Sequence, residues 1–372
     1  MKHTVINLVL ILLTLMSLSN CKNNLDVLAP GEESVSVYGI LNPNESVQKI
    51  RINKVYLTSD DAISIAKDEN QINYGPGELK VTLQRFVSGS SIPALTTITD
   101  GSKKEIVLTE TVVTTASGSF NQNQRIWQTN DRLYNSGEYK LTIKLVSSGK
   151  EITAQSVIID SVKPTNKMPF IYHPISYPMH GKYDLVKYPI QLNALINYSI
   201  LTATQKIEFK SVINAKLYEV VMRFHYKNIS LNSDTTNDYV DFNFFTVKSV
   251  SLKGDENLNV SFTASDFYNN LATEISKKNS SNVKSRISNY MEYIIFAGTE
   301  TLETFLEVNK PSNTIAQDKP YFTNIMGGVG IFSSKSKSTI THDLASDFID
   351  QIGCNSATKP FLFLRNDGIF CP

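Results

Sequence analysis

The sequence predicts a mainly β protein, in which an N-terminal immunoglobulin- or fibronectin-like β-sandwich precedes a second, α+β domain. Three observations lead to this prediction. Short runs of β-branched and aromatic residues alternate with polar residues throughout residues 34–163, which is typical of strands. Residues 191–340 mix such runs with a helical pattern. A stretch rich in proline and tyrosine, residues 164–190, separates the two regions.

The predicted sandwich, residues 34–163, contains six strand-like runs separated by turn signals. These runs are VSVYGIL, KIRINKVYL, ELKVTLQRFV, EIVLTETVV, YKLTIKLV and ITAQSVII. Six or seven short strands within roughly 130 residues are the pattern of an immunoglobulin-like sandwich.

Tyr139 lies in a stretch, Gly137-Glu138-Tyr139-Lys140-Leu141, that is similar to the late strand of immunoglobulin-like and fibronectin-like domains. In those domains a tyrosine at the start of the strand hydrogen-bonds back to the chain and holds the Greek-key corner. Tyr139 has two interpretations, such a corner tyrosine or an ordinary core aromatic residue. The sandwich prediction depends on neither.

The junction at residues 164–190 contains five prolines, which exclude a central strand or an uninterrupted helix. It is our candidate contact surface because five aromatic residues lie among these prolines: Phe170, Tyr172, Tyr177, Tyr183 and Tyr188. In an exported protein such rings could stack on sugars or another flat ligand. The simpler interpretation, which we favour, is that they seal the interface between two domains, since each aromatic side chain buries a large area.

The second domain, residues 191–340, is predicted to contain strands and helices, and residues 341–372 are predicted to add a helix and a tail. Along residues 216–226, apolar side chains alternate with Glu219, Arg223 and His225, which indicates a half-exposed strand. Further predicted elements are strands at 240–252 and 290–296, helices at 265–278, 299–307 and 344–352, and a short apolar segment at 361–364.

The first 20 residues read as a lipoprotein signal peptide. Lys2 precedes an apolar run, Val5 to Leu18, that is too short to cross about 30 Å of hydrocarbon. Leu18-Ser19-Asn20-Cys21 then resembles the bacterial lipobox, which implies acylation of Cys21 and cleavage before it. Asn20 departs from the usual Gly, Ala or Ser, and cleavage elsewhere with Cys21 as a bystander is the alternative. Residues 21–33 would form a tether to the first domain.

Charge and cysteine content narrow the possible partners and the compartment. Loss of Lys2 with the signal changes 36 basic residues to 35, equal to the 35 acidic residues, so a nucleic acid partner is not expected. Cys354 and Cys371 remain after lipidation of Cys21, and an exported protein favours a disulfide between them. Two free thiols or a metal pair are the alternatives, although no third cysteine or closely spaced histidine completes a zinc site.

No motif in the sequence predicts catalysis, a metal or a cofactor. The glycines of Ile325-Met326-Gly327-Gly328-Val329-Gly330 fit neither a P-loop nor a dinucleotide-binding spacing, so a backbone requirement explains them better. His173 and His180 lie in the junction without an obvious third ligand. No G-x-S-x-G motif is present, and no pair of carboxylates is selected by its spacing. We therefore expect a protein that is not an enzyme.

Two further motifs, together with the lipobox, resemble a known family. These are VYGILNP at residues 37–43 and YFTNIMGGVGIF at residues 321–332. The chain is similar to uncharacterised Bacteroidetes outer-membrane lipoproteins that carry a domain of unknown function. That resemblance implies a partnership with a TonB-dependent outer-membrane transporter, and it supplies no catalytic residues.

The function expected from the sequence is a non-catalytic binding or accessory module that is held at the outer membrane by lipid on Cys21. Lys22 follows this cysteine where an aspartate would favour inner-membrane retention, so the outer membrane is preferred. The periplasmic face and the cell surface both remain compatible with this prediction. The alternatives are a structural or adhesive envelope protein and, less favoured, an exported hydrolase.

Overall fold

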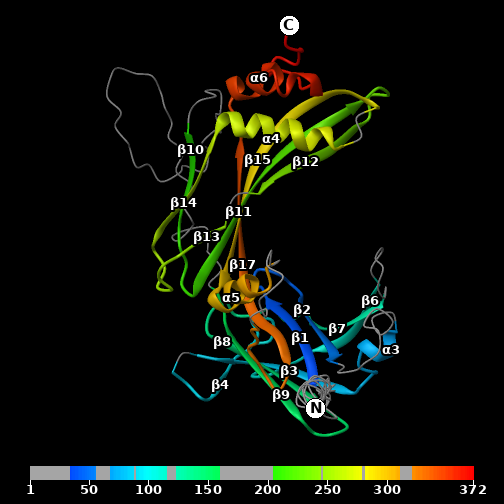
Figure 1. Ribbon diagram of the computed structural model, residues 1–372, viewed down its shortest axis with the longest axis vertical. Coiled ribbons are helices and arrows are strands. Elements are labelled where there is room, and N and C mark those ends of the chain that lie inside the picture. The colour runs from blue at the N-terminus through cyan, green and yellow to red at the C-terminus, as the bar shows by residue number, and fades with distance from the viewer. Residues whose placement is uncertain are drawn as a thin grey trace, which may run out of the picture.

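The computed structural model describes residues 34–55, 68–87, 89–114, 123–159, 204–243, 246–278, 281–310 and 321–372. Over these residues the protein is mainly β with few helices, as the sequence predicts. Figure 1 shows a sandwich at one end and a helix-covered sheet at the other, joined by long strands. The predicted signal peptide, the tether with Cys21 and the whole Pro/Tyr-rich junction lie outside the described residues.

Two sheets form the sandwich. One contains, in spatial order, β1 (Ser34–Leu41), β2 (Gln48–Val55), β7 (Asn123–Thr129) and β6 (Thr109–Thr114). The other contains β9 (Glu151–Val157), β8 (Glu138–Leu145), β3 (Leu79–Phe86) and β4 (Pro93–Ala94), with β5 (Ile106–Val107) also pairing with β3. A short helix, α3 (Glu69–Ile72), follows β2 in the chain. The orders β1-β2-β7-β6 and β9-β8-β3 match the A-B-E-D and G-F-C sheets of an immunoglobulin-like domain.

Alternation along the strands builds the sandwich core. Val35, Val37, Ile50 and Ile52 from one sheet pack with residues such as Ile143 from the other, and all are at most 1% exposed. Strand β7 was not predicted, because its sequence NQRIWQT is mostly polar. The predicted run EIVLTETVV divides into β5 and β6, which lie in different sheets.

Tyr139 holds a corner of the sandwich. Its hydroxyl donates to the carbonyl oxygen of Thr96 at 2.7 Å and accepts from the backbone N–H of Tyr134 at 2.9 Å. Burial raises the pKa of this hydroxyl, so it stays protonated and able to donate. Of the two interpretations from the sequence, the structure therefore shows the tyrosine that bonds back to the chain.

The second body is built on long strands. Its main sheet has the order β12 (Thr235–Asn243), β11 (Ala215–Ser230), β15 (Val283–Thr299) and β17 (Val329–Asp343). The short β13 (Val247–Lys248) also pairs with β11, and β10 (Thr204–Lys210) with β14 (Asn257–Thr263) forms a separate two-stranded sheet. The helical elements are α4 (Ala264–Ser276), α5 (Glu300–Val308), α6 (Ser346–Cys354) and the 3₁₀ turn η1 (Lys359–Phe361). Strand 240–252 was predicted as one element, but the structure places β12 and β13 there with a gap between them.

Helices α4 and α6 cover one face of this sheet (Figure 1). Phe267, Leu271 and Ile275 of α4 are buried, as their spacing predicts. The helix begins earlier than expected because Thr263 is its N-cap, and the Thr263 and Asp266 side chains form a reciprocal capping box.

The contacts that hold the C-terminal tail include a disulfide, a buried ring and a hydrogen bond from Arg286. Cys354 and Cys371 form the predicted disulfide. The Phe363 side chain is 1% exposed within the core of the second body. The buried guanidinium of Arg286 donates to the carbonyl oxygen of Phe361 at 2.5 Å. The tail is therefore part of the fold rather than an appendage.

Strand β17 belongs to both bodies. Its first half, from Val329 to Ser334, pairs with β1 in parallel, and its second half, from Lys335 to Asp343, pairs with β15 in antiparallel. A single nine-stranded sheet consequently runs from β12 to β6. The two-residue β16 (Ile325–Met326), just before β17, pairs with β9 of the other sandwich sheet. The sequence-based range 191–340 placed all of this segment in the second domain, whereas these pairings place residues 325–334 in the sandwich.

Gly330 is required where β17 meets β1. Its φ is +108°, and an added Cβ would lie 2.1 Å from the carbonyl oxygen of Val37. Gly328 is similarly close, with a Cβ position 2.7 Å from the carbonyl oxygen of Val35. Real Cβ atoms do not approach backbone oxygens this closely, so a backbone requirement explains these glycines, as predicted.

We predict that Gly330→Ala lowers the free energy of unfolding by about 3 kcal/mol or more, because the methyl group adds a backbone clash to the cost of a left-handed φ. Gly149→Ala is the matched control, because φ is +71° there and nothing lies within 4 Å of the added Cβ. The control should cost only about 1 kcal/mol. Urea unfolding measures both, and equal losses would contradict the close approach.

Candidate binding surface

The structure describes some of the predicted site residues and not others. Cys354 and Cys371 are joined, whereas Cys21 and the five aromatic residues of the junction lie outside the described residues. The two motifs that carry the family resemblance turn out to be neighbours. Val37 pairs with Gly330, and Gly39 with Phe332, in the parallel register of β1 and β17.

Side-chain hydrogen bonds hold the second motif and the start of β17 in place. The amide of Asn324 donates to the carbonyl oxygen of Phe332 at 2.6 Å, and its oxygen accepts from the N–H of Phe332 at 2.9 Å. The Ser334 hydroxyl donates to the carbonyl oxygen of Val157 at 2.7 Å. Both motifs therefore contribute to closing the sandwich.

The best candidate site lies on the face of the second sheet opposite α4 and α6, which we call the helix-free face. Along β11 the side chains of Val220, Met222 and Phe224 enter the core that the helices cover. Residues Arg223 and His225 alternate with them and are only partly buried. Strand periodicity thus places a cation and an imidazole side by side on the helix-free face.

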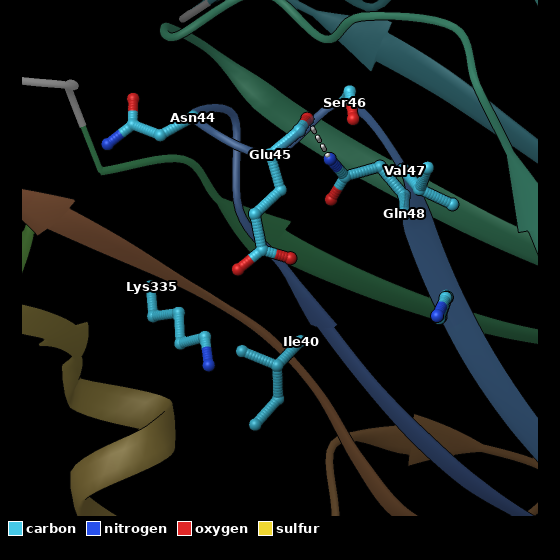
Figure 2. Close-up of a pocket in the computed structure, with 8 residues that line it drawn as sticks. Ile40, Asn44, Glu45, Ser46, Val47, Gln48 and Lys335 are labelled. Carbon is cyan, nitrogen blue, oxygen red and sulfur yellow. Dashed lines mark hydrogen bonds between the residues drawn. The ribbon is translucent and has the colours of Figure 1, made fainter. Parts of the chain in front are cut away.

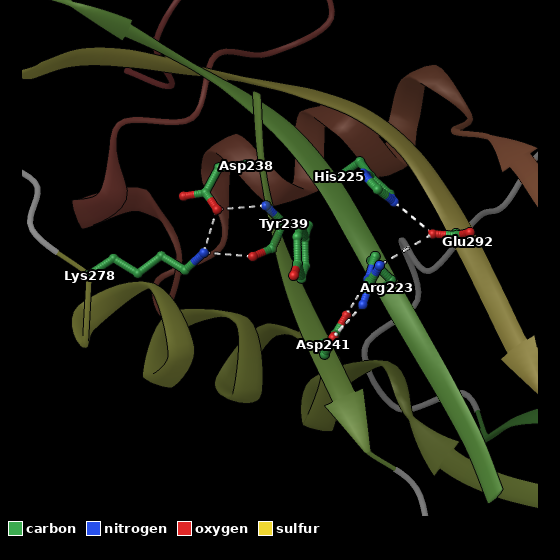
Figure 3. A network of polar contacts seen from close by, with 7 residues as sticks. All are labelled: Arg223, His225, Asp238, Tyr239, Asp241, Lys278 and Glu292. Atoms are coloured by element: carbon green, nitrogen blue, oxygen red, sulfur yellow. Dashed lines mark hydrogen bonds and ion pairs between the residues drawn. The ribbon is translucent and has the colours of Figure 1, made fainter. Parts of the chain in front are cut away.

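Arg223 is the centre of a network of polar contacts (Figure 3). Its Nε and Nη2 donate to the two carboxylate oxygens of Asp241, at 2.6 and 2.8 Å. Its Nη1 lies 4.0 Å from an oxygen of Glu292. Its guanidinium lies 4.0 Å from the centre of the Tyr239 ring. The hydrogen bonds to Asp241 raise the pKa of Arg223, so the charge is permanent.

His225 extends this network toward the neighbouring strand. Its Nε2 lies 3.0 Å from the same Glu292 oxygen that faces Arg223. Its ring stacks on Tyr290 with centroids 4.1 Å apart, and the Tyr239 ring is 5.9 Å away on the other side. We call these six residues the Arg223 cluster: Arg223, His225, Tyr239, Asp241, Tyr290 and Glu292.

The Arg223 cluster is preformed but accessible. The side chains of Arg223 and Asp241 are 26% and 31% exposed, and Tyr239 is 45% exposed. Each charged group already has an opposite partner, so no large rearrangement is needed before a second surface can pack on it. Tyrosine and arginine in such a setting are the residues that most often dominate the energy of protein–protein contacts.

The outer edge of β12 is closed beside this cluster. Lys278, just beyond α4, donates to Asp238 Oδ1 and to the carbonyl oxygen of Tyr239, both at 2.6 Å (Figure 3). The N–H of Tyr239 in turn donates to Asp238 Oδ1 at 2.8 Å. Burial works to raise the pKa of Asp238, but the hydrogen bonds from Lys278 and the Tyr239 N–H outweigh it and lower this pKa.

The titratable groups of the cluster contact one another. Its carboxylates face Arg223 or His225, and no serine, threonine or cysteine is hydrogen-bonded to His225 among the described contacts. Over the described residues, no group of three or more His, Cys, Asp or Glu side chains could hold a metal ion. The arrangement is suited to presenting charge and rings to a partner.

A pocket lies where the sandwich meets the second body (Figure 2). It has a volume of about 450 Å³ and is lined by Ile40, Asn44, Glu45, Ser46, Val47, Gln48, Lys49 and Lys335. The Gln48 amide hydrogen-bonds to the carbonyl oxygens of Asn42 and Glu45, which holds the β1–β2 turn at its rim. It is open and mainly polar, so it is a weaker candidate than the Arg223 cluster.

Comparison with known protein families gives no match, and neither does comparison with curated protein sequences. The resemblance to Bacteroidetes lipoproteins consequently stays a prediction from the two motifs.

Part of the Arg223 cluster was visible in the sequence. The alternation along β11 predicted that Arg223 and His225 share an exposed face, which the structure confirms. Asp241, Tyr290 and Glu292 were not singled out, because they pair with β11 only through the register of β12 and β15. The opposite charges of Arg223 and Asp241 are the sequence signal that could have indicated this strand pairing.

Replacing Arg223 tests the network directly. Arg223→Met should lower the free energy of unfolding by about 1 kcal/mol at low salt, because Asp241 and Glu292 lose the cation between them. The loss should shrink in about 1 M NaCl, where salt screens the remaining repulsion. Lys337→Met is the control, because Lys337 lies on β17 of the same sheet and forms no ion pair among the described residues; it should change stability little. A loss independent of salt would contradict an electrostatic role.

Proposed function

We propose that this protein is an outer-membrane lipoprotein that is anchored through acylated Cys21 and binds another protein with its helix-free face. The observation that carries the binding proposal is the Arg223 cluster, in which a paired guanidinium lies against the exposed Tyr239 ring. The anchor proposal rests on the lipobox-like sequence before Cys21. Among the described helices, none is long and apolar enough to span a membrane.

The proposed role is accessory rather than catalytic. Arg223 is held by Asp241 on one side and Glu292 on the other, so its contribution is a fixed charge with a flat surface. The motif resemblance favours an integral outer-membrane transporter of the TonB-dependent class as the partner. Such a partner would be held at the same membrane as the anchored chain, which raises its effective concentration near this face.

The anchor is tested by Cys21→Ala. The variant should lose incorporation of labelled fatty acid and appear in the soluble fraction, because an acyl chain contributes about 0.8 kcal/mol per buried CH₂ group. Cys371→Ala is the control, since that cysteine lies in the C-terminal disulfide and should leave the label in place. Labelling of the Cys21→Ala variant would contradict the lipoprotein assignment.

The binding face is tested by site-specific photo-crosslinking in intact cells. A photoreactive phenylalanine analogue at Tyr239 should form an adduct with an integral outer-membrane protein, identified by mass spectrometry. The same analogue at Tyr321, which is 69% exposed outside the Arg223 cluster, should give little of that adduct. Adding Arg223→Ala to the Tyr239 probe should reduce the adduct about tenfold. Equal adducts at both positions, or none at Tyr239, would argue against this face.

A further inference from the structure

The nine-stranded sheet ends at β12 on one side and at β6 on the other. An end strand exposes unpaired N–H and C=O groups, which can pair with a strand of another chain. At β12 the carbonyl and N–H of Tyr239 are already hydrogen-bonded to Lys278 and Asp238, which disfavours such pairing there. In the other sandwich sheet the end strands β4 and β16 are only two residues long, and β4 begins with Pro93.

Strand β6 has none of these protections. It is six residues long, TETVVT, and contains no lysine, arginine or proline. Its register with β7 runs without a shift from Thr109 to Thr114, so no bulge turns the edge away. Apart from its pairing with β7, its main-chain groups make no hydrogen bond among the described contacts.

The side chains of β6 also favour contact. Val112 and Val113 are 47% and 36% exposed, and they point to opposite faces of the sheet. The one charged residue, Glu110, forms an ion pair with Arg125 of β7 and accepts a hydrogen bond from the N–H of Gly77. Its charge is therefore neutralised within the same sandwich and does not repel an approaching strand.

We propose that β6 pairs in antiparallel fashion with β6 of a second copy of this chain, across a two-fold axis. The edge of a strand is complementary to itself under such a rotation, because each outward donor meets an equivalent acceptor. With the axis at Val112, Val112 lies opposite Val112 of the second copy, Thr111 lies opposite Val113, and Glu110 lies opposite Thr114. No like charges then face each other within the described part of the strand.

Net charge and interface area indicate how stable this dimer is. The chain has 36 basic and 35 acidic residues, a net charge of +1, so two copies meet with little net repulsion. Six residues per strand bury much less than the roughly 1,600 Å² of a standard interface. The result is a reversible dimer that forms in the micromolar range rather than an obligate one.

Sedimentation of the full chain in detergent, over about 1 to 100 µM, tests the proposal. The average mass should rise from one chain of 41.6 kDa toward twice that value. The double variant Val112→Lys/Val113→Lys should weaken dimerisation at least tenfold, because it places lysines on an edge that lacks them. The matched double variant Val107→Lys/Val146→Lys should dimerise like the wild type, because these valines, 57% and 61% exposed, lie in β5 and just after β8, away from β6.

A cross-linking measurement covers the case in which the lysine variant fails to fold. Val112→Cys should form a covalent dimer under mild oxidation, and Val146→Cys should not. Sedimentation as a monomer over the whole range, or equal cross-linking at both positions, would overturn the proposal. A dimer that the Val112→Lys/Val113→Lys variant leaves unchanged would overturn it as well.

Discussion

The parallel pairing of β17 with β1 is the contact on which the rest of the structure depends. It joins Ser36–Leu41 to Val329–Ser334, which are nearly 300 residues apart in the chain. Because the backbone of Gly330 lies against the carbonyl of Val37, only glycine allows the approach. The same segment adds β16 to the opposite sandwich sheet, so one late piece of the chain closes both sheets.

This shared strand also places the candidate binding surface. Beyond Ser334, β17 continues without a break into the second body and pairs with β15, which in turn carries Tyr290 and Glu292 of the Arg223 cluster. Hydrogen bonds stiffen β17 where it passes from the sandwich into the second body. The hydroxyls of Thr299 and Ser333 lie 2.5 Å apart, and the Asn44 amide donates to the carbonyl oxygen of Lys337 at 2.8 Å. The helix-free face is thus held by continuous sheet rather than by a linker.

The fold was predictable from the sequence where local patterns decide it. Alternation revealed most sandwich strands, and the spacing of Phe267, Leu271 and Ile275 revealed α4. Strand β7 was missed because its polar residues conceal the buried Ile126 and Trp127. The role of the Gly327–Gly330 segment was recognised only as a backbone requirement. The pairing of this segment with β1 was not predicted, since parallel pairing between strands far apart in the chain leaves no local sequence pattern. Of the six residues of the Arg223 cluster, the sequence pattern predicted only Arg223 and His225, because residues such as Asp241 and Glu292 join the cluster through strand register.

Strand β17 should make the sandwich and the second body one cooperative unit. Native-state hydrogen exchange, followed at the amides of residues 35–41 in β1 and 290–298 in β15, tests it most directly. We expect the slowest amides of both strands to exchange through one opening with the same free energy and the same dependence on denaturant. Exchange of the β1 amides through a smaller opening, while β15 stays protected, would contradict it.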